Sequence, residues 1–328
     1  MRKTFGGRQF WTDHFLHHDW RIQRHCRSGE FRLLDEANCL RHTGTFDSCL
    51  GQFRDLVVFE CIAPMESTVV VLLHGLGDVR KIMRHLECEI RNIDGYSAVS
   101  MDYASTRNPM ADHADALASI VEHLSDAKTI HFVSYSMGSI VVRHYLADLQ
   151  RLADSMRTDS SNAATSVDKH AETSAKFGRQ VMIGAPNHGA ELAKMIGIAS
   201  PILPAILGES SVQLGRRWEE TRDRLATPSF EFGIIAGSSG RLVGGNPFIS
   251  GANDWVVGVE ETKLAGAADF RVYPVAHALM PRSRRVIDST VQFLKHGYFE
   301  SPETARPLLE QTLAAAPLAK VSGAGDAQ

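Results

Sequence analysis

Residues 132–142 read Phe-Val-Ser-Tyr-Ser-Met-Gly-Ser-Ile-Val-Val and place Ser136 between a short apolar strand and a helical pattern. A turn this sharp holds its central serine in a strained backbone conformation with the hydroxyl exposed. It needs small residues two before and two after the serine, where helix and strand approach closely. Gly138 meets that need, whereas Ser134 stands where the usual G-x-S-x-G pattern has glycine. The segment predicts Ser136 as an activated nucleophile, with a helix cap at a strand end as the alternative.

The composition is that of a globular enzyme. The chain has 328 residues, 44% of them hydrophobic, and a net charge of −3, which fits one large α/β core. Without a Lys/Arg-rich stripe interleaved with aromatics, nucleic acid is not an expected partner. The five cysteines show no C-x-x-C spacing and indicate reduced thiols. His14, His17, His18 and His25 have no carboxylate or thiol pattern around them, so we expect no metal site.

Targeting signals are not apparent. Residues 1–20 are basic in part but contain no apolar core of a signal peptide. Nothing approaches the roughly 18 consecutive apolar residues of a membrane span. A cytoplasmic location is therefore expected.

Apolar runs alternate with helical patterns between residues 69 and 299, which predicts a mostly parallel sheet flanked by helices. Strands are expected at 69–73, 97–101, 130–133, 180–183, 231–235 and 270–275, and helices at 79–93, 117–124, 140–149 and 286–294. We expect an N-terminal extension at 1–60, in which 54–62 adds an antiparallel edge strand, and a main domain at 61–300. Within it, the polar segment 154–178 is expected to be a mobile insertion, and 301–328 a poorly ordered tail.

A glycine-containing loop follows the first of these strands, in the sequence Leu-Leu-His-Gly-Leu-Gly-Asp at 72–78. Acyl transfer creates a negatively charged oxygen, and fixed backbone N–H groups stabilise it without reorganisation. We predict the N–H groups of Leu76 and Met137 as the two donors of this oxyanion hole. His74 and Gly75 would support the loop. A generic strand-to-helix glycine turn is the alternative.

The partners of the serine are expected later in the chain, the acid before the histidine. Asp254 lies in a Gly/Asn-rich loop after the strand at 231–235, and His277 follows the last strand. An imidazole must take the proton of a serine hydroxyl, and a carboxylate fixes the tautomer of that imidazole. The prediction is a Ser136, His277, Asp254 triad. Asp102 is the leading rival acid, although it precedes the serine, and Glu260, Glu261, His188 and His296 are weaker rivals.

The chain resembles the α/β-hydrolase superfamily, and within it the lipase and esterase branch, from about residue 69 to 299. The resemblance rests on residues 73–77, the elbow at 134–138, the Gly-Ala-Pro-Asn-His-Gly-Ala segment at 184–190, residues 253–257 and His277. The segment at 184–190 looks like one in bacterial triacylglycerol lipases and in relatives of enzymes that deacylate GPI inositol. We interpret it as a capped turn in the pocket wall. The resemblance implies ester hydrolysis without a cofactor, through an acyl-serine.

Substrate clues come from the apolar residues 195–208, within the connection at 187–230. In this position family members often carry a lid, which would suit acyl chains and touch a membrane surface transiently. A short core helix broken by Pro201 and Pro204 is an equal alternative. The expected activity is hydrolysis of a lipid-like carboxylic ester. A thioesterase or acyltransferase with the same triad, and a non-catalytic binding or scaffold protein, are the alternatives, and the oligomeric state stays open.

Overall fold

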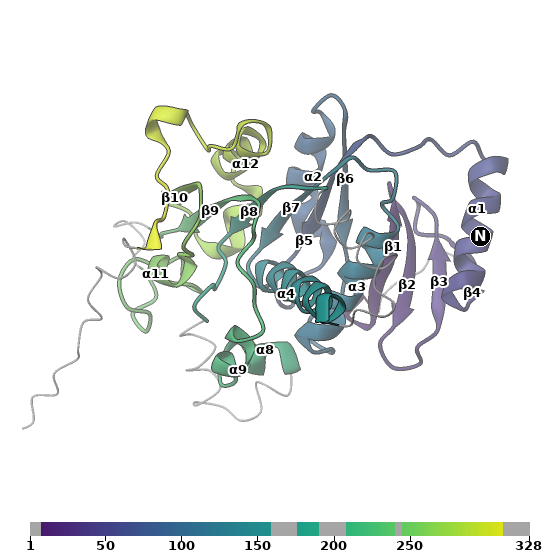
Figure 1. Cartoon of the computed structure of the whole chain (residues 1–328), viewed down its shortest axis with the longest axis horizontal. Coiled ribbons are helices and arrows are strands. Elements are labelled where there is room, and N and C mark those ends of the chain that lie inside the picture. The colour runs from purple at the N-terminus through teal and green to yellow at the C-terminus, as the bar shows by residue number, and fades with distance from the viewer. Residues whose placement is uncertain (1–7, 159–175, 190–207, 240–244, 311–328) are drawn as a thin grey trace, which may run out of the picture.

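The centre of the protein is a six-stranded sheet in which every neighbouring pair is parallel (Figure 1). The computed structural model describes residues 8–158, 176–189, 208–239 and 245–310. The strands are β5 (Thr68–Leu73), β6 (Tyr96–Met101), β7 (Thr129–Tyr135), β8 (Phe177–Ile183), β9 (Glu231–Gly237) and β10 (Asp269–Tyr273). Their order is β10-β9-β8-β7-β5-β6. The parallel sheet expected from the sequence is confirmed.

Helices cover both faces of this sheet, which explains why β5 is a continuous apolar run. Val69, Val71 and Leu73 face a cluster with α3 (Met110–Glu122) and α4 (Met137–Thr158). Val70 and Leu72 face the opposite cluster, with α2 (Arg84–Arg91) and α12 (Arg284–His296). The core therefore lies in two layers, one on each side of the strands.

The strand order reverses between β5 and β7. The chain leaves β5 for β6 on one side and then returns to β7 on the other. In open parallel sheets, ligands bind outside the carboxyl ends of the strands at such a reversal. The loops that follow β5 and β7 are thus the expected walls of a site.

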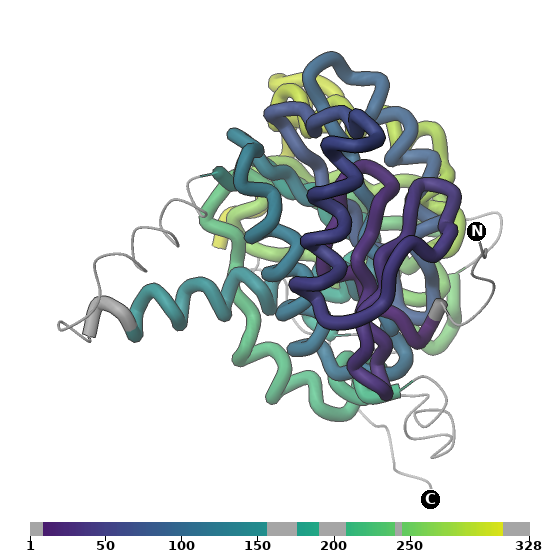
Figure 2. The backbone as a smooth tube through the Cα atoms, turned by 90° about the vertical axis from the view of Figure 1, so that its right-hand side faces the viewer, coloured from purple at the N-terminus to yellow at the C-terminus, as the bar shows by residue number. Residues whose placement is uncertain are grey.

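The N-terminal part forms a second, antiparallel sheet. It begins with the turn η1 (Arg8–Phe10) and contains β1 (Trp11–His17), β2 (Trp20–His25), β3 (Phe31–Leu34) and β4 (Leu40–Gly44), in that order. Helix α1 (Phe46–Phe59) packs on it through a cluster of Phe15, Trp20, Ile22, Leu33, Cys49, Leu50 and Phe53. This sheet stands beside β6 and α3, in front in Figure 2.

The edge strand expected at 54–62 is wrong, because 54–59 belong to α1. Thr45 caps this helix by accepting a hydrogen bond from the Ser48 N–H. Buried side chains follow at positions 49, 50 and 53, a helical spacing. Capping and periodicity together outweigh the β-branched residues near the end of the segment.

The insertion, the connection at 187–230 and the tail also differ from expectation. Helix α4 extends to Thr158 and β8 begins at Phe177, so only 159–175 of the expected insertion lie outside the described residues. Residues 190–207, most of the expected apolar lid, also lie outside them. The rest of that connection contains α8 (Glu209–Leu214) and α9 (Trp218–Arg222), which pack on the α3–α4 side of the core.

Residues 301–310, expected in the tail, pack on the domain. They contain the turn η4 (Pro302–Thr304), and buried Leu308 donates its N–H to the Ala267 carbonyl at 2.9 Å. The remaining tail, 311–328, lies outside the described residues. Within the described ranges, no helix has the length and apolar character that crossing a membrane requires.

Candidate active site

Ser136 occupies a sharp turn between β7 and α4. Its φ is +53°, a conformation that costs free energy for a non-glycine residue. Gly138 makes the turn feasible, because a Cβ there would lie 2.8 Å from the carbonyl oxygens of Leu73 and His74. The turn therefore has the geometry expected for an exposed nucleophile.

Ser134, the departure from the glycine pattern, is fully buried and well bonded. Its Oγ donates to the Val181 carbonyl at 3.3 Å and accepts from Gln180 Nε2 at 3.1 Å. The Ser139 hydroxyl lies 3.0 Å from the same oxygen. The serine is accommodated by three polar neighbours, so its presence leaves the turn intact.

The structure brings Ser136, His277 and Asp254 into one hydrogen-bonded chain. His277 Nε2 lies 3.0 Å from Ser136 Oγ, and His277 Nδ1 lies 2.6 Å from Asp254 Oδ2. Asp254 is completely buried and His277 nearly so. The two residues come from the loops that follow β9 and β10, beside the turn after β7.

Backbone groups fix the Asp254 carboxylate. Its Oδ1 accepts hydrogen bonds from the N–H groups of Val256 at 3.0 Å and Val257 at 2.7 Å. Trp255, between Asp254 and Val256, has a φ of +84°, so the chain turns back toward the carboxylate. The second oxygen is left for the imidazole.

Three neighbours fix His277, the first residue of the turn η3 (His277–Arg282). Its N–H donates to the Asp254 carbonyl at 2.9 Å, and its carbonyl accepts from the Tyr135 hydroxyl at 3.1 Å. Gly184, with φ of +58°, backs the ring, since a Cβ there would lie 3.0 Å from His277 Cε1. Gly184, the first residue of the segment predicted to form the pocket wall, thus packs against the imidazole. Tyr135 is not among the site residues predicted from the sequence, although it directly precedes Ser136.

The loop after β5 lies against the nucleophile. A Cβ on Gly75 would be 3.1 Å from Ser136 Cβ. Met137 is the first residue of α4, where N–H groups have no intrahelical partner and the helix dipole is positive. Gly75, the residue before Leu76, and Met137 thus lie next to Ser136. The role of Leu76 and Met137 as oxyanion donors stays a prediction.

No protein-family model matches the chain, and no curated protein sequence matches it. Solved structures do. The lipase BlEst2 of Bacillus licheniformis in its mature form superposes with a TM-score of 0.50 at 18% sequence identity, over 72% of this chain and 94% of the lipase. The propeptide form of the same lipase superposes with a TM-score of 0.50 at 17% sequence identity, over 73% of this chain and 52% of that chain. The chain has the α/β-hydrolase fold.

Asp102, the main rival acid, faces another part of this α/β-hydrolase fold. Its carboxylate accepts the Arg80 N–H at 2.6 Å and pairs with Arg21 at 3.3 Å. The ring of His74 stacks on Tyr103 with 4.1 Å between centroids, and its Nδ1 lies 2.8 Å from the Gly75 carbonyl oxygen. Burial lowers the pKa of His74. The His74 ring thus contacts Gly75 and Tyr103, and its role in supporting the loop stays a prediction.

The other rivals have partners elsewhere. Glu260 pairs with Lys263 at 2.8 Å, and Glu261 accepts the Gly258 N–H at 2.6 Å. The His188 N–H donates to the Glu261 carbonyl, and the ring of His296 stacks on Tyr298. Across the described ranges, no group of three or more His, Cys, Asp or Glu side chains could hold a metal ion.

Large apolar side chains are exposed on the two loops that carry Asp254 and His277. Phe248 is 67% exposed, Trp255 42% and Leu279 56%. Phe248 and Trp255 are tied together, since Asn246 accepts the Phe248 N–H and donates to the Trp255 carbonyl. We refer to Phe248, Trp255 and Leu279, which are exposed on the segments that carry Asp254 and His277, as the apolar rim.

Proposed function

We propose that this protein is a serine hydrolase that cleaves carboxylic esters through an acyl-serine intermediate. The observation that carries the proposal is the chain of contacts from Ser136 Oγ through His277 to buried Asp254, at 3.0 and 2.6 Å. A strained serine in the turn after the central strand supports it. The α/β-hydrolase fold alone does not specify an activity.

In the proposed mechanism, Ser136 Oγ attacks the acyl carbon while His277 Nε2 takes the hydroxyl proton. Asp254 holds the imidazole in the required tautomer and stabilises its cation. The N–H groups of Leu76 and Met137 bind the negative oxygen of the tetrahedral intermediate. The intermediate collapses to the acyl-serine, and His277 protonates the departing alcohol. Water then attacks the acyl-serine while His277 takes its proton, and His277 returns that proton to Ser136 Oγ as the acid leaves.

An ester with an apolar acyl chain is the proposed substrate class. The apolar rim supports this, because exposed aromatic and aliphatic groups beside a site bind apolar ligand surface. Hydrolysis of p-nitrophenyl esters of graded chain length measures the preference. Added alcohols distinguish hydrolysis from acyl transfer, since a transferase would form the new ester in their presence.

The decisive test is labelling with a fluorophosphonate probe followed by peptide mass spectrometry. We expect an adduct on the Ser136 peptide, lost in Ser136→Ala, strongly reduced in His277→Ala and absent after heat denaturation. A folded protein without an adduct, with or without detergent, would reject the enzyme and favour a binding protein.

A further inference from the structure

One carboxamide of the N-terminal segment contacts two loops of the main domain. Gln9 Nε2 donates to the Asp78 carbonyl at 2.7 Å. Its Oε1 accepts from Ser105 Oγ at 3.3 Å and from Thr106 Oγ1 at 3.1 Å. Ser105 Oγ in turn accepts the Gly77 N–H at 3.0 Å. Gln9 thus joins the loop after β5 to the loop after β6.

These contacts bracket Leu76, the proposed oxyanion donor. Gly75 lies against Ser136 on one side, and Gly77 and Asp78 are held by Ser105 and Gln9 on the other. One hydrogen bond within the loop, from the Asp78 N–H to the Gly75 carbonyl at 3.3 Å, closes the turn that contains Leu76, and Gly77 in this turn has a φ of +76°. The direction of the Leu76 N–H therefore depends on the anchors around it. An oxyanion donor acts only when it is held in place before the reaction.

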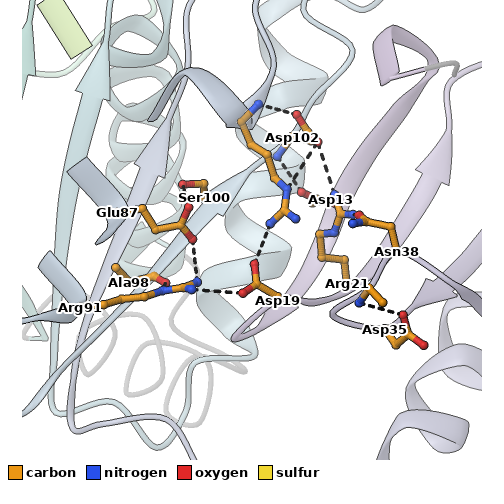
Figure 3. Close-up of polar contacts among 12 residues, drawn as sticks. Asp13, Asp19, Arg21, Asp35, Asn38, Glu87, Arg91, Ala98, Ser100 and Asp102 are labelled. Carbon is orange, nitrogen blue, oxygen red and sulfur yellow. Dashed lines mark hydrogen bonds and ion pairs between the residues drawn. The ribbon is translucent and has the colours of Figure 1, made fainter. Parts of the chain in front are cut away.

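The far end of the same loop is fixed by the N-terminal sheet as well. The Arg80 N–H donates to Asp102 Oδ1 at 2.6 Å. Asp102 is held from β1, because its N–H donates to Asp13 Oδ2 at 2.6 Å and its carbonyl accepts the Asp13 N–H at 2.8 Å. Arg21 of β2 pairs with the Asp102 carboxylate (Figure 3). Both ends of the loop from 77 to 80 are thus anchored through residues before position 25.

We propose that Gln9 is a positioning residue of the active site, and that the N-terminal segment holds the oxyanion loop in its working conformation. The inference rests on the proposed function. Misplacing one donor affects the charged transition state far more than the bound ester. Gln9→Leu should therefore lower kcat by about 10- to 100-fold and leave KM within about twofold. This decrease is smaller than the decrease in kcat of about 100- to 1,000-fold that removal of an oxyanion donor causes.

The experiment compares Gln9→Leu and the isosteric Gln9→Glu with the wild type on a short p-nitrophenyl ester. The carboxylate of Gln9→Glu still accepts from Ser105 and Thr106 but cannot donate to the Asp78 carbonyl. It should therefore lose kcat as well. The matched control is Ser119→Ala, which removes a bond from Ser119 Oγ to the His14 carbonyl (2.8 Å), a contact between the N-terminal sheet and α3. This control should keep kcat within twofold.

Inhibition by an alkyl trifluoromethyl ketone, which forms the oxyanion, gives a readout that general destabilisation does not move. Its affinity should fall with kcat across the variants. Folded Gln9 variants with wild-type kcat, or with only KM raised, would overturn the inference, as would an equal kcat loss in Ser119→Ala. A wild-type protein without turnover or Ser136 labelling would instead reject the proposed function.

Discussion

Gly138 lies over the carboxyl end of β5, where a Cβ would come within 2.8 Å of the His74 carbonyl oxygen. The turn around Ser136 therefore packs directly on the start of the loop that contains Leu76, the proposed oxyanion donor. The helix that follows Ser136 can approach the strand only because residue 138 has no side chain.

Gly138→Ala should destabilise the protein by roughly 1–3 kcal/mol, because backbone atoms must move to admit the methyl group. Urea unfolding measures the effect. The control is Gly51→Ala in α1, where a Cβ meets nothing within 4 Å and alanine should raise stability by about 0.5–1 kcal/mol. Equal stability of Gly138→Ala and the wild type would mean that the elbow is looser than described.

Restoring the glycine pattern with Ser134→Gly should destabilise the protein. The substitution removes the acceptor of the Gln180 Nε2 donor and a neighbour of Ser139 Oγ, both fully buried. A buried donor without a partner costs about 1–3 kcal/mol. Adding Gln180→Leu to Ser134→Gly should recover part of that loss in urea unfolding. A more stable Ser134→Gly single variant would contradict this account.

Asp254→Asn should lower kcat by about four orders of magnitude, because an amide no longer holds His277 in the reactive tautomer. Thermal unfolding should show that the variant remains folded. Glu260→Gln, in a rival acid that pairs with Lys263, should keep kcat within twofold. The assignment of the acid would be wrong if the two substitutions exchanged these effects.

Because of the Asp13 carboxyl, the free energy of unfolding should fall as pH rises from 4 to 6. Burial raises the pKa of this carboxyl from 3.8 to about 6, against the attraction of Arg21. In this window the unfolded chain has lost the Asp13 proton while the folded chain keeps it, so rising pH favours unfolding. The loss amounts to on the order of 1–3 kcal/mol. Urea unfolding at pH 4 and 6.5 should show a flatter dependence for Asp13→Asn, and parallel curves would refute the prediction.

The apolar rim should set the preference for long acyl chains. Trp255→Ser combined with Leu279→Ser should reduce kcat/KM for a decanoate ester by about 10-fold relative to an acetate ester, because apolar contact area is lost. Phe59→Ser, at an 86% exposed position on α1, serves as the control and should leave the ratio unchanged. An unchanged ratio in the double variant would place the acyl chain elsewhere.

The parallel sheet and the three residues of the proposed triad could be selected from the sequence for one physical reason. Strands buried on both faces are continuous apolar runs, as at β5, and the carboxyl ends of parallel strands meet at one edge. Selecting Ser136, Asp254 and His277 required only that each follow such a strand in the expected order. The structure brings these three together.

The N-terminal sheet could not be predicted in the same way. Its strands bury Asp13, Arg21 and Gln23, so the alternation of apolar and polar residues that marks a half-buried strand is broken. The contact from Gln9 to Asp78 spans 69 positions, and that from Asp13 to Asp102 spans 89. Such pairs leave no local pattern, because only the folded chain brings them together.

The reciprocal bonds between Asp13 and Asp102 couple the N-terminal sheet to the parallel sheet. If one sheet opens alone, the Asp13 carboxylate loses the Asp102 N–H and the Asp102 carboxylate loses Arg21. The N-terminal sheet and the parallel sheet should therefore melt in one cooperative transition. During synthesis from the N-terminus, Asp13 of the N-terminal sheet would lack its Asp102 partner until the residues after β6 have been made.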